Sequence, residues 1–134
     1  MRKFTGTVIS LALLALAAAG PAQAAVTVAV AGYEASSLGF ATPVVVAPSG
    51  GPVNLIVADP SSAPHNFAAK SRFRSSGAWC SSFPVGRCPY FWSPLIGASG
   101  PQTTPVQGLT GLAAGEYDFY CTLHTTMTGT LRIV

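Results

Sequence analysis

The sequence predicts an all-β protein that folds as one antiparallel β-sandwich. Short runs rich in β-branched residues recur about every eight to twelve residues, which is the spacing of strands in a sandwich. The 14 glycines and 11 prolines of the 134-residue chain are scattered along it, as turns between short strands require. No stretch combines a helical apolar period with capping residues. Together these three observations favour the sandwich class over mixed or helical folds.

Six segments are expected to form the strands. They are residues 26–32, 44–46, 53–57, 106–109, 116–121 and 130–134. The first alternates β-branched with small residues, and a Pro/Ser/Gly turn separates the second from the third. Alternation within the fifth segment places Tyr117, Phe119 and Cys121 on one face. Residues 70–104 are the least regular, and we expect them to form a long, disulfide-tied excursion from the edge of the sandwich.

The first 24 residues have the pattern of a secretory signal peptide. A basic start precedes an apolar run, and the small-residue site AQA follows. Cleavage is expected between Ala24 and Ala25, which leaves residues 25–134 as one exported domain, periplasmic or extracellular. No later stretch reaches the roughly 18 apolar residues that a membrane helix needs, so no stable membrane insertion is expected.

The charge pattern excludes nucleic acid as a partner. The formal net charge of the whole chain is +3. Without Arg2 and Lys3, five cationic and four acidic side chains remain, so the net charge falls to about +1. Four of the five cations are spread over residues 70–87 and form no basic stripe. About 110 residues suffice for one hydrophobic core, and we expect a monomer.

The chain has three cysteines, an odd number for an exported protein. Cys80 and Cys88 lie close together in the segment WCSSFPVGRCP, where Pro84 and Gly86 can turn the chain. We expect these two cysteines to form a disulfide. Cys121 would then be a lone thiol in an oxidising compartment, which is a liability unless a metal occupies it.

The segment FYCTLHTTMTG places three metal-binding side chains three residues apart: Cys121, His124 and Met127. Thiolate, imidazole and thioether are soft or borderline ligands. The only other histidine of the chain is His65, in the segment PHNF at the end of an expected strand. Two imidazoles, one thiolate and one axial thioether are the ligands of blue-copper sites, so the residues predict copper.

These segments resemble the cupredoxins, the small blue type 1 copper proteins, a family with a Greek-key β-sandwich fold. GLAAGEYDFYCTLHTTMTGTLRIV resembles the closing hairpin of that family, and PHNF resembles its first-histidine motif. Within the plastocyanin- and amicyanin-like members, the short spacing of the ligand loop is most similar to amicyanin. The resemblance extends over residues 26–134 but has no match in residues 71–100.

The resemblance implies a role for each candidate residue. His65, Cys121 and His124 would be the equatorial ligands of one type 1 copper, and Met127 the weak axial ligand. Asn66 would tie the two ligand loops together, and its backbone N–H would lie near the Cys sulfur. Such outer contacts orient ligands and tune the reduction potential.

The implied function is that of a one-electron carrier between transient redox protein partners, without enzymatic activity. Electrons would leave through the edge of His124, near solvent among apolar residues such as Leu123, Phe40 or Pro64. Small, weak contacts are typical of redox encounters.

The other functions considered fit the residues less well. A copper-binding protein for storage or delivery is the chief alternative, although such proteins often carry Met- and His-rich strings that this chain lacks. Structural zinc wants four N, S or O ligands, and thioether is not among them. Covalent haem needs a CxxCH motif. A cysteine hydrolase would need an orienting carboxylate, for which only Asp118 is near in sequence. A multicopper oxidase domain would need further histidines.

Overall fold

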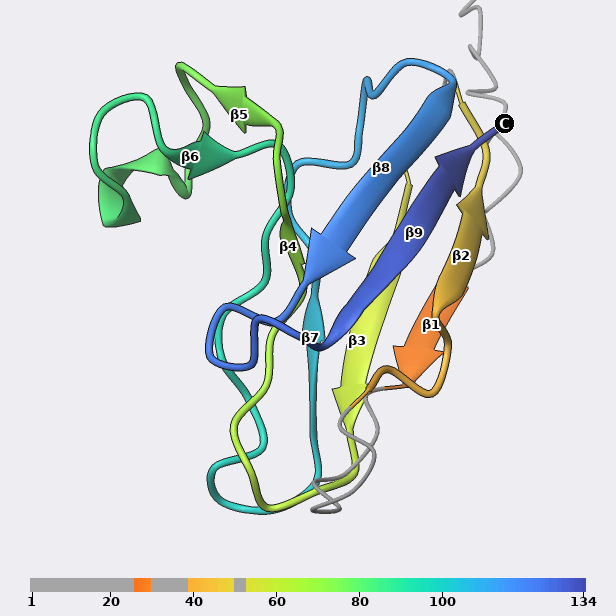
Figure 1. Cartoon of the computed structure of the whole chain (residues 1–134), viewed down its shortest axis with the longest axis vertical. Helices are drawn as coiled ribbons and strands as arrows, with labels where there is room; N and C mark the ends of the chain where they lie inside the picture. The colour runs from red at the N-terminus through yellow and green to blue at the C-terminus, as the bar shows by residue number, and fades with distance from the viewer. Residues whose placement is uncertain (1–25, 30–38, 50–52) are drawn as a thin grey trace, which may run out of the picture.

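The computed structural model describes residues 26–29, 39–49 and 53–134 (Figure 1). The predicted signal peptide, its cleavage site and the second half of the predicted strand 26–32 lie outside the described residues. Within the described ranges, none of the helices has the length and apolar character needed to span a bilayer.

Seven strands form two sheets, which lie one behind the other in Figure 1. One sheet has the order β1 (Val26–Ala29), β3 (Leu55–Asp59), β7 (Gln102–Pro105). The other has the order β2 (Val44–Ala47), β9 (Thr128–Ile133), β8 (Gly115–Tyr120), β4 (Ala68–Ala69). A separate pair, β5 (Phe73–Arg74) and β6 (Cys88–Pro89), projects beside β4 and β8 together with the 3-10 turn η1 (Cys80–Ser82). The predicted all-β sandwich is confirmed.

The strand directions are mixed, which corrects the prediction of a purely antiparallel sandwich. β8 and β9 form an antiparallel hairpin, but β1 pairs with β3 in parallel, and β2 pairs with β9 in parallel. The cause is the path of the chain between the sheets. β2 belongs to the opposite sheet, so the chain crosses over between β1 and β3 and re-enters the first sheet in its original direction.

The strand predicted at residues 106–109 was wrong, because the extended segment is β7, four residues earlier. Thr103 and Thr104 supply its β-branched residues and pair with β3. Gly108 has a φ of 88°, a left-handed conformation that ends any extended run there. Residues 70–104 were predicted to lie outside the sandwich, but the last of them belong to β7, which is a strand of the first sheet.

An aromatic cluster forms the centre of the core. The rings of Phe67 and Phe119 lie 4.1 Å apart, and Phe40 and Phe91 pack against them. In β8, Tyr117 and Phe119 point inward while their neighbours face solvent, which confirms the predicted alternation. A Cβ at position 129 would overlap the Phe119 ring, so only glycine fits opposite it in β9.

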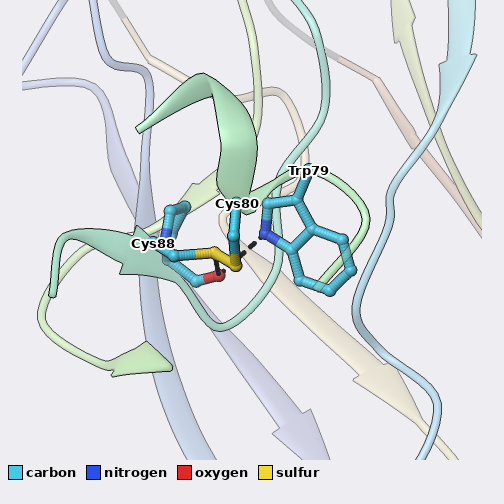
Figure 2. The surroundings of a disulfide bond; sticks show 4 residues. Trp79, Cys80 and Cys88 are labelled. Carbon is cyan, nitrogen blue, oxygen red and sulfur yellow. Dashed lines mark hydrogen bonds between the residues drawn. A yellow bond between two sulfur atoms is a disulfide. The ribbon is translucent and has the colours of Figure 1, made fainter. Parts of the chain in front are cut away.

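The predicted disulfide between Cys80 and Cys88 is confirmed, with the two Cα atoms 5.0 Å apart (Figure 2). It joins η1 to β6 within the projecting segment. Beside it, the indole Nε1–H of Trp79 donates a hydrogen bond of 3.0 Å to the carbonyl oxygen of Pro89. The segment therefore has its own covalent and hydrogen-bonded anchors, and these come from sequence-local residues.

We predict that replacing both Cys80 and Cys88 with alanine lowers the free energy of unfolding by about 2 to 3 kcal/mol, because the unfolded chain regains the entropy of a short closed loop. Urea denaturation followed by tryptophan fluorescence measures this loss. The control is Val85→Ala in the same loop, where the side chain is fully exposed and the change should stay within about 0.5 kcal/mol. An unchanged midpoint in the double variant would show that the projecting segment unfolds independently of the sandwich.

Candidate metal centre

The end of β8 and a tight loop position three of the candidate ligands. Cys121 follows β8 directly and continues its inward alternation. The loop closes on itself, since the Cys121 N–H donates to the Met127 carbonyl oxygen at 3.0 Å and the Met127 N–H donates to the His124 carbonyl oxygen at 2.8 Å. The two ends of the ligand loop are therefore held together by backbone bonds, and the side chains of Cys121 and Met127 are both fully buried.

His65 reaches the same place from a different part of the chain. It lies in the connection between β3 and β4, and its backbone exchanges two hydrogen bonds of 2.9 Å with Ile96. Its side chain is completely buried. These two hydrogen bonds form a backbone clamp that fixes the main chain of His65. The imidazole can then move only by rotation about its side-chain bonds.

The structure brings the side chains of His65, Cys121 and His124 together. The Cys121 Sγ lies 3.7 Å from the His124 Nδ1. The ring centroids of His65 and His124 are 5.0 Å apart. Met127 belongs to the same loop, with its thioether side chain inside the core. Sequence positions 65 and 121 to 127 thus converge, although about half of the domain separates them along the chain.

The donor types and one unpaired atom fit a metal. The His65 Nε2 is buried and has no hydrogen-bond partner, which is costly for an imidazole nitrogen unless a ligand occupies it. In the described parts of the chain, no group of three or more His, Cys, Asp or Glu side chains already has a metal-binding arrangement. The argument that these residues fit a metal therefore depends on the short distances between pairs of their side chains. It also depends on their combination of imidazole, thiolate and thioether groups.

Asn66 links the two halves of the site through its side chain. Its Oδ1 accepts hydrogen bonds from the Thr122 N–H at 2.8 Å and from the Thr122 Oγ1 at 3.1 Å. Its Nδ2–H donates to the Ser93 carbonyl oxygen at 3.3 Å. The carboxamide is buried, so these bonds are shielded from water. Asn66 thus fixes the residue after His65 against the residue after Cys121.

Sequence reasoning missed one residue of the site, Asp59. This carboxylate ends β3, is buried, and lies 2.8 Å from the His65 Nδ1 through its Oδ2. In the sequence it belongs to the segment ADPSS, which has the composition of a turn. The sequence did contain one indication of this role. Asp59 is an acidic residue at the end of an apolar strand, six residues before the only histidine in that half of the chain.

Exposed apolar side chains lie next to the candidate site in the sequence. The His124 side chain is half-buried, and its chain neighbour Leu123 is exposed by 53%. Leu95, the neighbour of Ile96, is exposed by 46%. Pro64 is partly buried. Phe40, which was predicted to lie near solvent, is instead buried, because its ring packs edge-on against Phe119 at 4.8 Å.

By sequence, neither the protein-family models nor the characterised proteins compared with this chain give a match. Solved structures of amicyanin variants do match its fold. A Cu(I) structure of a methionine-to-alanine variant has 19% identity and a TM-score of 0.52, covering 84% of this chain and 85% of that one. An oxidised proline-to-alanine variant has 19% identity and a TM-score of 0.54, covering 82% of each chain. A second Cu(I) methionine-to-alanine variant has 21% identity and a TM-score of 0.53, with coverages of 84% and 85%.

The chain therefore has a cupredoxin-like β-sandwich fold, and the predicted resemblance is confirmed at that level. The three solved structures described above are all variants of amicyanin. At these identities the likeness describes the fold, and the role of each residue has to be argued from the chain itself.

Proposed function

We propose that this protein is an exported type 1 copper protein that carries single electrons between transient redox partners and catalyses no reaction by itself. One observation carries the proposal most strongly. The imidazoles of His65 and His124 and the thiol of Cys121 come together in a cupredoxin-like sandwich, and Met127 lies in the same loop as Cys121 and His124.

Each residue would have a distinct task. His65, Cys121 and His124 would hold the metal, and the thioether of Met127 would be a weaker fourth donor. Bound copper would supply a store for one electron by changing between Cu(I) and Cu(II). Because His65, Cys121 and Met127 are fully buried, water is kept away from that side of the site. The backbone clamp on His65 and the Asn66 bonds resist movement, which keeps reorganisation small when an electron arrives or leaves.

The test of this proposal is a Cu(II) titration of the chain from Ala25 onward, followed by visible absorption and electron paramagnetic resonance. We expect an intense blue band that saturates at one copper per chain. A colourless complex would overturn the electron-carrier function and favour copper storage or delivery. Binding of zinc in preference to copper would overturn both, although the buried thioether of Met127 is not a usual zinc ligand.

The surface formed by His124 and the exposed Leu123, which we call the rim, is the expected contact surface for redox partners. Its role can be tested without knowing those partners. Electrons also pass between two copies of such a protein, and nuclear magnetic resonance line broadening in a Cu(I)/Cu(II) mixture measures that self-exchange rate. We predict that Leu123→Glu slows self-exchange by about tenfold or more, because two rims would then bring like charges together.

The matched control for this variant is Val85→Glu, which adds the same charge at a fully exposed position in the loop between Cys80 and Cys88. This change should leave the rate nearly unaltered. If both variants slowed self-exchange equally, net charge rather than contact at the rim would govern the encounter, and the rim would lose its assigned role.

A further inference from the structure

We propose that the protein binds a small oxyanion, through a phosphate or carboxylate group, at the junction between the sandwich and the projecting segment formed by β5, η1 and β6. The guanidinium groups of Arg72 and Arg74 would hold the anion. In Figure 1 the projecting segment lies well above the loop that follows β8, which contains three of the candidate metal ligands. The site is therefore separate from the candidate metal centre, and the proposal does not depend on copper.

An open cavity of about 460 Å³ lies at this junction. Arg72, which directly precedes β5, and Arg74, within β5, line it from the projecting segment. Residues 111–113 and Tyr117 of β8 line it from the sandwich. The Tyr117 O–H donates a hydrogen bond of 2.8 Å to the Ala113 carbonyl oxygen, which holds this wall against β8. The cavity thus has walls from two separate parts of the fold.

Aromatic rings hold both guanidinium groups in place. The Arg72 guanidinium lies over the Tyr117 ring, 4.6 Å from its centroid. The Arg74 guanidinium lies 5.0 Å from the ring centroid of Trp79 and 5.5 Å from that of Tyr90. Such cation–π contacts restrict long side chains before a ligand arrives, so less conformational entropy is lost on binding.

The positive charge of this cavity is not compensated within the part of the chain that the structure describes. Neither Arg72 nor Arg74 forms an ion pair with a described carboxylate, whereas Arg132 pairs with Glu116 at 2.8 Å. None of the described residues that line the cavity is acidic. The Nε of Arg74 is buried and has no hydrogen-bond partner among the described residues, which is unfavourable for a donor. These features favour an anionic ligand.

The chemistry of the two side chains indicates the class of ligand. Each guanidinium presents a planar fork of N–H donors that matches the oxygen atoms of a carboxylate or a phosphate. The volume of the cavity lies within the range of sites that bind small molecules. We therefore expect a small oxyanion rather than the surface of another protein. Because the arginines and Tyr117 belong to opposite walls, a bound anion would also join the projecting segment to the sandwich.

The first experiment titrates inorganic phosphate, and separately succinate, into the copper-free chain from Ala25 onward. Sodium chloride keeps the ionic strength constant. Two-dimensional 1H–15N spectra follow the Nε–H of each arginine. We expect the signals of Arg72 and Arg74 to shift and saturate with at least one of the two anions, which also shows whether phosphate or carboxylate is preferred. The signal of Arg87, which does not line the cavity, should stay in place. Equal shifts at all arginines, or no saturation with either anion, would overturn the proposal.

The second experiment compares Arg72→Gln and Arg74→Gln with Arg87→Gln. The third variant removes the same charge from the same segment, where the Arg87 guanidinium lies over the Phe73 ring outside the cavity. We expect the first two variants to bind the preferred anion about tenfold or more weakly, because charge-assisted hydrogen bonds are lost. The control should change the affinity by less than about twofold, since its charge is screened by salt. Equal weakening in all three would mean that net charge alone attracts the anion.

Arg74→Lys separates the shape of the guanidinium from its charge. Lysine keeps the charge but lacks the planar fork, so this variant should also bind the anion more weakly. An affinity equal to that of the wild type would contradict the role of Arg74. Thermal unfolding with and without the anion gives an independent measurement, since a ligand of the folded state raises its melting temperature. That rise should be present in Arg87→Gln and largely lost in Arg72→Gln, whose exposed side chain can be replaced without disturbing the core.

Discussion

Cys121→Ser is expected to abolish the blue absorption of the copper-loaded protein completely. The colour of a type 1 site comes from charge transfer between a thiolate and copper, and a serine hydroxyl offers no comparable donor. Cys121 is the one free cysteine, since Cys80 and Cys88 are joined to each other. Its side chain is fully buried and lies 3.7 Å from the His124 Nδ1, so no other thiol can replace it. Visible absorption and electron paramagnetic resonance during a Cu(II) titration measure the loss.

The control for this variant removes sulfur elsewhere. The double replacement of Cys80 and Cys88 by serine takes two sulfur atoms from the projecting segment and should leave the blue band intact at saturating copper. A band that persisted after Cys121→Ser would mean that copper binds at a different place, and the ligand set proposed here would have to be abandoned. Because serine is nearly the same size as cysteine, the variant tests the sulfur rather than the packing.

Phe67→Ala is expected to cost about 3 to 5 kcal/mol of unfolding free energy, the usual range for losing a buried aromatic ring. Phe67 is fully buried between Phe40, Phe91 and Phe119, whose ring centroids lie 4.1 to 6.1 Å from its own. The total free energy of unfolding of a small domain is about 5 to 15 kcal/mol, so this loss would remove a large share of its stability. Chemical denaturation of the copper-free protein measures it without the added stabilisation of a bound metal.

Two further variants show whether burial is the cause. Phe67→Leu keeps most of the apolar volume and should cost clearly less than alanine. Phe73→Ala removes a ring that is 41% exposed, and the resulting loss should be small. Equal losses for Phe67→Ala and Phe73→Ala would contradict the placement of Phe67 at the centre of the core. Because Phe67 is two residues from His65, its loss should also loosen the candidate metal centre.

Much of the candidate site could be predicted from the sequence, because the chemistry of its residues is scarce in this chain. Two histidines and one cysteine outside the disulfide leave few ways to build a metal site. The spacing of Cys121, His124 and Met127 is local, so one short loop must hold them. The alternation in β8 is local as well, and it correctly placed Tyr117 and Phe119 inside.

The tertiary structure decided what depends on residues far apart in the chain. The parallel pairing of β1 with β3 follows from the crossing of the chain between sheets, which no local pattern records. The position of β7 was set by its pairing with β3, which overrode the more apolar residues that follow it. The hydrogen bonds from Thr122 to Asn66 likewise join residues 56 positions apart.

Asp59 shows the same difference between local sequence pattern and tertiary contact within the site. Its sequence surroundings indicate a turn, and nothing in them distinguishes a solvated carboxylate from one buried against an imidazole. Only the fold brings His65 and Gly97 against it. The sequence by itself determined which side chains can bind a metal, because that depends on residue chemistry. The tertiary structure decided which nitrogen of His65 is left unpaired, because that depends on how distant segments pack.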